Sequence, residues 1–142
     1  MEIKRKSLAY ITVNEELLVF SQPDFPEAGI QVPKGTIEEG DSPKETIIRE
    51  IEEETGIHYT DTPEYLGEKN TIVRRSDDTI IEHRHFFHCK LRTKPAESWE
   101  HYEHHAKNST EPILFSFFWI PIKDAKSILR ANQGELLQKI LQ

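Results

Sequence analysis

Three glutamates, Glu50, Glu53 and Glu54, stand close together in the sequence and could act jointly on a cation. At 100° of helical rotation per residue, with Glu50 at zero, Glu53 lies at about −60° and Glu54 at about +40°. A helix would present all three on one face, where like charges repel by about 0.2–0.5 kcal/mol per pair. A hard divalent cation such as Mg²⁺ would offset that repulsion. The alternative is a solvated acidic face on a surface helix, which charge content alone favours.

The residues around these glutamates predict a helix that begins after Ser42 and ends near Thr55. Ser42 is a good N-cap, Pro43 suits the first helical position, and Glu45 completes a capping box with Ser42. Gly56 is a suitable residue to follow the last turn. Beside the carboxylates lies an apolar stripe, which we expect to pack on a sheet: Ile47, Ile48 and Ile51.

The spacing of this segment resembles the Nudix box, G-x5-E-x7-R-E-U-x-E-E-x-G-U, in which U is a bulky aliphatic residue. The matching positions are Gly35, Arg49, Glu50, Ile51, Glu53, Glu54, Gly56 and Ile57. Asp41 departs from the pattern, which has glutamate there. Aspartate keeps the carboxylate and shortens the side chain by one methylene. In the family this residue supports the structure of the box, so we expect reduced fit and retained function.

This resemblance implies an α/β fold: a Nudix-type α/β/α sandwich, with a mixed sheet and helices on both faces. It also implies metal-dependent hydrolysis of a pyrophosphate bond in a nucleoside diphosphate linked to another moiety, with Mg²⁺ or Mn²⁺ as cofactor. The partner would be a small nucleotide-type substrate. Two alternatives stay open: a non-catalytic Nudix-fold module that senses a nucleotide, and a family member with different chemistry. Sensing modules tend to lose box carboxylates, which this chain keeps.

The same resemblance assigns roles to the matching residues. Glu50 and Glu54 are similar to metal ligands of the family, and Glu53 to a ligand that also helps to activate water. The backbone carbonyl of Gly35 would add a metal contact. Arg49 would orient the catalytic glutamates through a salt bridge. The catalytic set is therefore Glu53, Arg49 and Glu50, and the metal set is Gly35, Glu50, Glu53 and Glu54.

In several family members a further glutamate outside the box acts as general base. The candidates in this chain are Glu82, Glu97, Glu100, Glu103 and Glu111. The sequence alone does not choose among them, and each is more often a plain surface residue than a base.

Weaker candidates for substrate contact are Arg84, His85 and Trp99, and Trp99 could instead anchor its loop by packing. The run H-x-H-x-x-H comprises His83, His85 and His88. On a strand, the first two would share a face and His88 would point the other way. A zinc site would then need another ligand, for which the candidates are His101, His104 and His105.

The remaining elements are predicted from apolar runs and turn residues. We expect a hairpin from strands at 7–13 and 17–21, further strands at 65–73, 79–91 and 113–122, and short helices at 123–129 and 135–141. The polar segment 92–112 shows no clear period and predicts a long loop, a kind of segment that is often functional.

Composition limits the possible classes of protein. The 142 residues fit a single domain over 1–142, and the net charge of −7 disfavours non-specific binding to nucleic acid or anionic membranes. The single cysteine, Cys89, excludes an intramolecular disulfide. We find no apolar run long enough for a membrane span and no secretory signal, so we expect a cytoplasmic monomer or homodimer.

Overall fold

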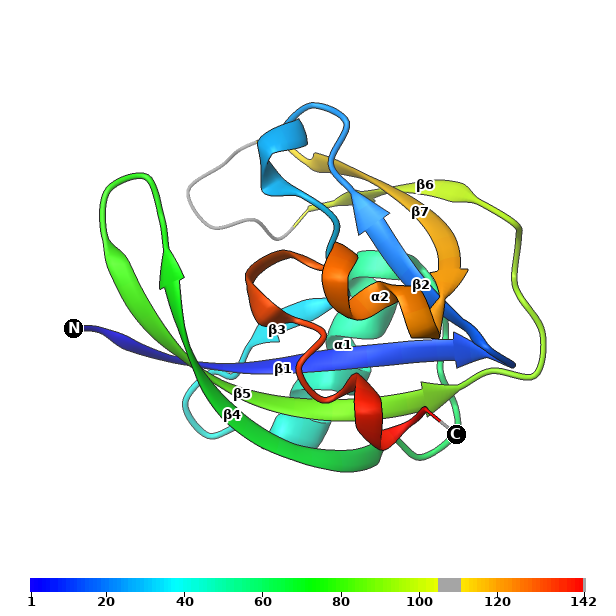
Figure 1. Cartoon of the computed structure of the whole chain (residues 1–142), viewed down its shortest axis with the longest axis horizontal. Helices are drawn as coiled ribbons and strands as arrows, with labels where there is room; N and C mark the ends of the chain where they lie inside the picture. Colours follow the sequence, from blue (N-terminus) through cyan, green and yellow to red (C-terminus); the bar gives the residue numbers. More distant parts are fainter. Residues whose placement is uncertain (105–110, 142) are drawn as a thin grey trace.

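A mixed β-sheet runs through the computed structural model, which describes residues 1–104 and 111–141 (Figure 1). Its strands are β1 (Ile3–Val13), β2 (Glu16–Ser21), β3 (Lys34–Thr36), β4 (Glu64–Arg74), β5 (Thr79–Lys90), β6 (Trp99–Glu103) and β7 (Ile113–Pro121). The helices are α1 (Pro43–Thr55) and α2 (Ile122–Ile128), with 3₁₀ turns η1 (Pro26–Ala28), η2 (Arg130–Asn132) and η3 (Leu137–Lys139).

The strand order is β4-β5-β1-β2-β7-β6, and β3 pairs separately with β1. β1 and β5 run parallel, and the other named pairs are antiparallel. The predicted hairpin is confirmed by β1 and β2, which turn at Asn14 with φ of 54°. Asparagine tolerates this left-handed conformation better than most residues. The mixed sheet also agrees with the expected fold.

Apolar side chains pack on both faces of the sheet. Leu8 and Tyr10 of β1 belong to the core beneath α2 and the C-terminal segment. Ala9 and Ile11, which alternate with them, belong to the core that includes Ile51 of α1. In Figure 1, α1 lies behind the sheet, and α2 with the C-terminal segment lies in front. The expectation of helices on both faces is therefore confirmed.

Helix α1 begins and ends at the predicted residues. The hydroxyl of Ser42 accepts a hydrogen bond from the Glu45 amide at 3.1 Å. Gly56, with φ of 81°, follows the last turn, a conformation that favours glycine. The apolar stripe is narrower than predicted, because Ile48 is 38% exposed whereas the other two isoleucines are fully buried.

Two predicted segments differ from the structure. Within the expected loop 92–112, β6 pairs with β7. Its polar sequence lacks an apolar alternation, because its inner side chains face the polar end of α1. The expected helix 135–141 is only the short turn η3, and the chain bends just before it at Ala131 and Asn132, both with positive φ. Among the described residues, no helix is long and apolar enough to cross a membrane.

Candidate active site

Strand β3 and helix α1 bring Gly35 against Glu50. Gly35 is buried, and a side-chain carbon added at its Cα would overlap the Glu50 side chain. The start of α1 is held to the sheet by Ser7 of β1, whose hydroxyl donates to the Pro43 carbonyl at 2.8 Å. Because the helix lies this close to β3, only glycine at position 35 leaves the Glu50 side chain its place.

Strand β6 is attached to the carboxyl-terminal end of α1 by two side-chain hydrogen bonds. The indole Nε1 of Trp99 donates to the Thr55 carbonyl at 2.9 Å. The Nε2 of His101 lies 2.9 Å from the Glu53 carbonyl, and it must carry the proton because a carbonyl only accepts. Both bonds satisfy carbonyls that the last helical turn leaves unpaired. Since side chains alternate along a strand, Glu103 lies on the same side of β6 as Trp99 and His101.

As a result, the carboxyl groups of Glu50, Glu54 and Glu103 converge. Each offers an oxygen, and the three oxygens lie within 4.8 Å of one another. Glu54 and Glu103 are buried, and Glu50 is half-buried. The Lys34 amide donates to Oε1 of Glu54 at 3.3 Å. We call these three glutamates the carboxylate cluster.

Burial opposes charge in this cluster. It raises the pKa of Glu54 well above its usual range, and the negative charges of Glu50 and Glu103 raise it further. Burial is also the main cause that raises the pKa of Glu50. Two raised carboxyl pKa values this close together favour one shared proton over two negative charges. A divalent cation can replace that proton, and the all-oxygen donor set suits Mg²⁺ or Mn²⁺.

The other two box residues with expected roles lie beside this cluster. Glu53 is half-buried, and its charge contributes to the raised pKa of Glu50. Arg49 forms an ion pair with Asp41, with Nη1 3.1 Å from Oδ2. The positive charge of Arg49 acts to lower the pKa of Glu50. Asp41, although shorter than the glutamate of the family pattern, thus reaches Arg49 and holds its guanidinium beside α1.

Among the candidate glutamates outside the box, Glu103 is the one that joins the carboxylate cluster. Glu97 is 88% exposed at its side chain and pairs with Lys94 at 3.3 Å. Glu100 and Glu111 are exposed, and Glu100 occupies the opposite side of β6 from Glu103. The sequence signal that could have identified Glu103 is its period-two spacing from Trp99.

Glu82, the remaining candidate, is buried in an ion-paired group away from the cluster. Its carboxylate lies 3.0 Å from Nζ of Lys34 and 2.9 Å from Nε of Arg84. Burial acts to raise the pKa of Glu82, but Lys34 and Arg84 outweigh it and lower the pKa below its usual value. Glu82 is therefore held as a carboxylate that neutralises two cations.

The weaker substrate candidates have structural partners. The Arg84 side chain is fully buried and also donates to the Ala131 carbonyl at 2.7 Å. Trp99 stacks on Phe117, with ring centroids 5.3 Å apart. These contacts match the packing alternative for Trp99. His85 lies on β5 opposite Glu68 of β4.

The histidine run behaves as expected in its alternation. The rings of His83 and His85 stack at 4.9 Å, whereas His88 lies 2.8 Å from the Thr12 hydroxyl. Among the described residues, the group beside the two stacked rings is Glu68, which was not among the expected ligands and which the antiparallel pairing of β4 and β5 places there. His101 is bound to the end of α1 and His104 is exposed, while His105 lies outside the described residues.

A basic pocket of about 240 Å³ lies next to the Lys34–Gly35 segment. Its charged lining residues are Lys4, Lys6, Lys34, Arg75, Arg130 and Glu82. Lys34 connects this pocket to the carboxylate cluster, because its side chain reaches Glu82 while its backbone amide donates to Glu54. Five cations against one carboxylate favour an anionic occupant.

A family model described as "NUDIX domain" matches residues 4–140. The chain therefore belongs to the Nudix family. Its box, fold and carboxylate cluster agree with that membership.

Two curated relatives and one solved structure are similar to this chain. The RNA pyrophosphohydrolase of Cereibacter sphaeroides is 40% identical over 55 residues, a match that covers 37% of this chain and about a third (34%) of that relative. The RNA pyrophosphohydrolase of Pseudoalteromonas translucida is 22% identical over 136 residues, covering 89% and 78%. The E. coli dihydroneopterin triphosphate pyrophosphohydrolase has a TM-score of 0.67 at 16% identity, covering 98% and 97%, which supports the fold.

Proposed function

We propose that this chain hydrolyses a pyrophosphate bond in a nucleoside diphosphate linked to another moiety, with Mg²⁺ or Mn²⁺ as cofactor and residues 1–142 acting as one domain. The observation that carries the proposal is the convergence of Glu50, Glu54 and Glu103 within 4.8 Å. Family membership supports it, as do the two relatives named RNA pyrophosphohydrolase.

In this proposal Gly35, Glu50, Glu53 and Glu54 hold the cation. A cation bound there would neutralise phosphate charge and lower the pKa of a bound water. Glu103, which comes from β6, takes the proton of the attacking water as general base. Arg49 and Asp41 keep the helix face in position beside Glu50.

We place the phosphate groups of the substrate at the basic pocket. Lys34 supports this position, because it links the pocket lining to Glu54. A substrate that lies across this link would present one phosphate to the carboxylate cluster and the next to the lysines and arginines. The relatives' names lead us to include a 5′-triphosphorylated RNA among the substrates to be tested.

The test is a phosphate and pyrophosphate release screen with Mg²⁺ across nucleoside triphosphates, nucleotide sugars, dinucleotides, dinucleoside polyphosphates and that RNA. Glu53→Gln and Glu103→Gln are assayed beside the wild type, with Glu100→Gln as the matched control on the outer side of β6. We expect Glu103→Gln to lose about 10²–10⁴-fold in turnover, the range for general acid–base catalysis, and Glu100→Gln to remain active.

Full activity in Glu53→Gln or Glu103→Gln would refute the corresponding assignment. The rival sensing module makes a different prediction. It would show no turnover on any substrate, together with nucleotide binding that raises the melting temperature.

A further inference from the structure

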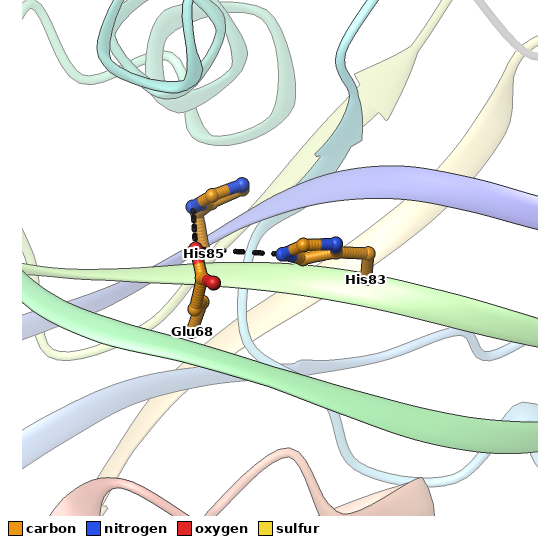
Figure 2. A group of neighbouring side chains, drawn as sticks. All are labelled: Glu68, His83 and His85. Atoms are coloured by element: carbon orange, nitrogen blue, oxygen red, sulfur yellow. Dashed lines mark ion pairs between the residues drawn. The ribbon is translucent and has the colours of Figure 1, made fainter.

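A second group of potential metal ligands lies on the ladder between β4 and β5, apart from the carboxylate cluster. Glu68 of β4 stands opposite His85 of β5 in the antiparallel register, and His83 follows on the same face. Figure 2 shows the His85 ring above the Glu68 carboxylate and the His83 ring to its right, with a nitrogen of each ring directed to the carboxylate. The three side chains thus come from two hydrogen-bonded strands.

The distances in this group suit metal coordination better than hydrogen bonding. Oε2 of Glu68 lies 3.5 Å from Nε2 of His83 and 3.6 Å from Nδ1 of His85. Hydrogen bonds from N–H to oxygen usually measure about 2.7–3.2 Å. For a tetrahedral zinc with bonds of about 2.0–2.2 Å, neighbouring ligand atoms are separated by about 3.3–3.6 Å. All three ligand atoms lie within 4.8 Å of one another, so small side-chain rotations complete the arrangement.

Tyr65 offers a further oxygen at the same place. Its hydroxyl lies 2.9 Å from Nδ1 of His85 and 3.4 Å from Oε2 of Glu68. A hydroxyl that donates to Nδ1 engages the lone pair a metal would use, so a bound ion must displace this hydrogen bond and leave the hydroxyl to donate to Glu68. The position not filled by the three ligands can then be taken by water.

The protonation of His85 is compatible with coordination. Burial lowers its pKa, and the charges of His83 and Arg5 lower it further, against the opposing effect of Glu68. A lowered pKa favours the neutral imidazole, which is the form that binds a metal. The positive charge of Arg5 also opposes a bound cation, so a moderate affinity is expected rather than that of a closed structural site.

We propose that Glu68, His83 and His85 form a binding site for a late first-row divalent cation, with Zn²⁺ as the ligand of choice. Two imidazoles and one carboxylate match the preferences of Zn²⁺, whereas the all-oxygen carboxylate cluster matches those of Mg²⁺. The exposed fractions are 57% for the Glu68 side chain, 33% for His83 and 11% for His85, so an ion can enter from solvent at the edge strand β4. Zn²⁺ bound here joins β4 to β5.

The test is a calorimetric titration of the whole chain with ZnCl₂ in excess Mg²⁺, which occupies the carboxylate cluster. His83→Ala and Glu68→Gln are the test variants, because both side chains are partly exposed and their replacement should leave the fold intact. His58→Ala is the matched control, since His58 is also paired with a carboxylate, Glu52 at 3.0 Å, but outside the group.

We expect the wild type and His58→Ala to bind one Zn²⁺ with equal affinity. We expect His83→Ala and Glu68→Gln to bind it at least about tenfold more weakly, because even outer-shell partners of a metal contribute about 10–100-fold to its affinity. Co²⁺ absorption provides a second readout: a tetrahedral nitrogen and oxygen spectrum should appear in the wild type and vanish in both test variants. Zn²⁺ affinity and Co²⁺ spectra that are equal in all four proteins would overturn the proposal, as would the loss of binding in His58→Ala alone.

Discussion

At the scale of single residues, Glu54 bears the largest electrostatic conflict of the candidate active site. It is buried, it faces Glu50 and Glu103, and its pKa is raised well above the usual value. A buried carboxylate without a cation is costly, and the shared proton only partly relieves that cost. Functional sites commonly hold such groups, which lower the stability of the fold but serve the function of the site.

This conflict predicts how the stability of the metal-free protein depends on pH. The folded-state pKa values of Glu50 and Glu54 lie above their ordinary value of 4.5. Their contribution to stability is therefore complete below about pH 4.5 and is lost as the pH rises through the raised folded values. In EDTA, we expect the melting temperature to fall with rising pH more steeply in the wild type than in Glu54→Gln.

Glu82 has the opposite effect on the pH dependence of stability. Its pKa is lowered in the folded protein, so the stability that it contributes is lost as the pH falls. The wild type and Glu54→Gln both contain Glu82, so its contribution cancels when their pH profiles are compared. Identical pH profiles in the two proteins would show that the carboxylate cluster is not strained when metal is absent.

Asp41 illustrates how a departure from a family pattern is accommodated. The shorter carboxylate still pairs with Arg49 at 3.1 Å. Their side chains are 29% and 40% exposed, so the pair contributes only about 0–1 kcal/mol to stability. Its role is to direct the guanidinium along α1.

At the scale of elements, β6 determines whether the carboxylate cluster has its third member. Trp99 and His101 attach this strand to the end of α1, and Glu103 follows two residues later on the same side. β6 otherwise pairs only with β7 at the edge of the sheet, within the described residues. Its attachment to α1 therefore sets the distance from Glu103 to Glu50 and Glu54.

This arrangement predicts that His101 is a positioning residue. His101→Ala should lower kcat with little change in KM, because the variant loses the bond to the Glu53 carbonyl and Glu103 shifts. His101→Gln, which keeps a donor, should recover part of the loss. Steady-state kinetics with the best substrate of the release screen provide the measurement, and Tyr102→Ala, on the exposed side of β6, is the control.

A purely structural role for His101 would lower the melting temperature and leave kcat per folded molecule unchanged. That outcome would show that the attachment of β6 through His101 has no role in catalysis.

At the scale of the whole molecule, local patterns predicted much of the fold. Helix α1 follows from the cap residues Ser42 and Gly56, and the hairpin β1–β2 follows from two apolar runs around Asn14. The box carboxylates were found for the same reason, since their spacing lies within one helix. Each of these features depends on residues close together in the chain.

What could not be predicted depends on pairing between distant segments. Glu103 reaches the carboxylate cluster through β6, a polar strand without an apolar alternation. Glu68 reaches His83 and His85 through the register of β4 and β5, and the basic pocket combines residues from β1, β5 and the C-terminal turns. These contacts depend on the exact register of paired strands, and approximate strand bounds do not define it, because a slip of one residue exchanges the two faces.

Manganese binding followed by electron paramagnetic resonance tests the metal assignment without any known substrate. The proteins compared are the wild type, Glu54→Gln and, as control, Glu97→Gln, whose side chain is 88% exposed. We predict that the wild type and Glu97→Gln bind Mn²⁺ with equal affinity, and that Glu54→Gln binds it at least about tenfold more weakly. Equal binding in all three proteins would contradict the assignment of Glu54 as a ligand of the cation in this Nudix protein.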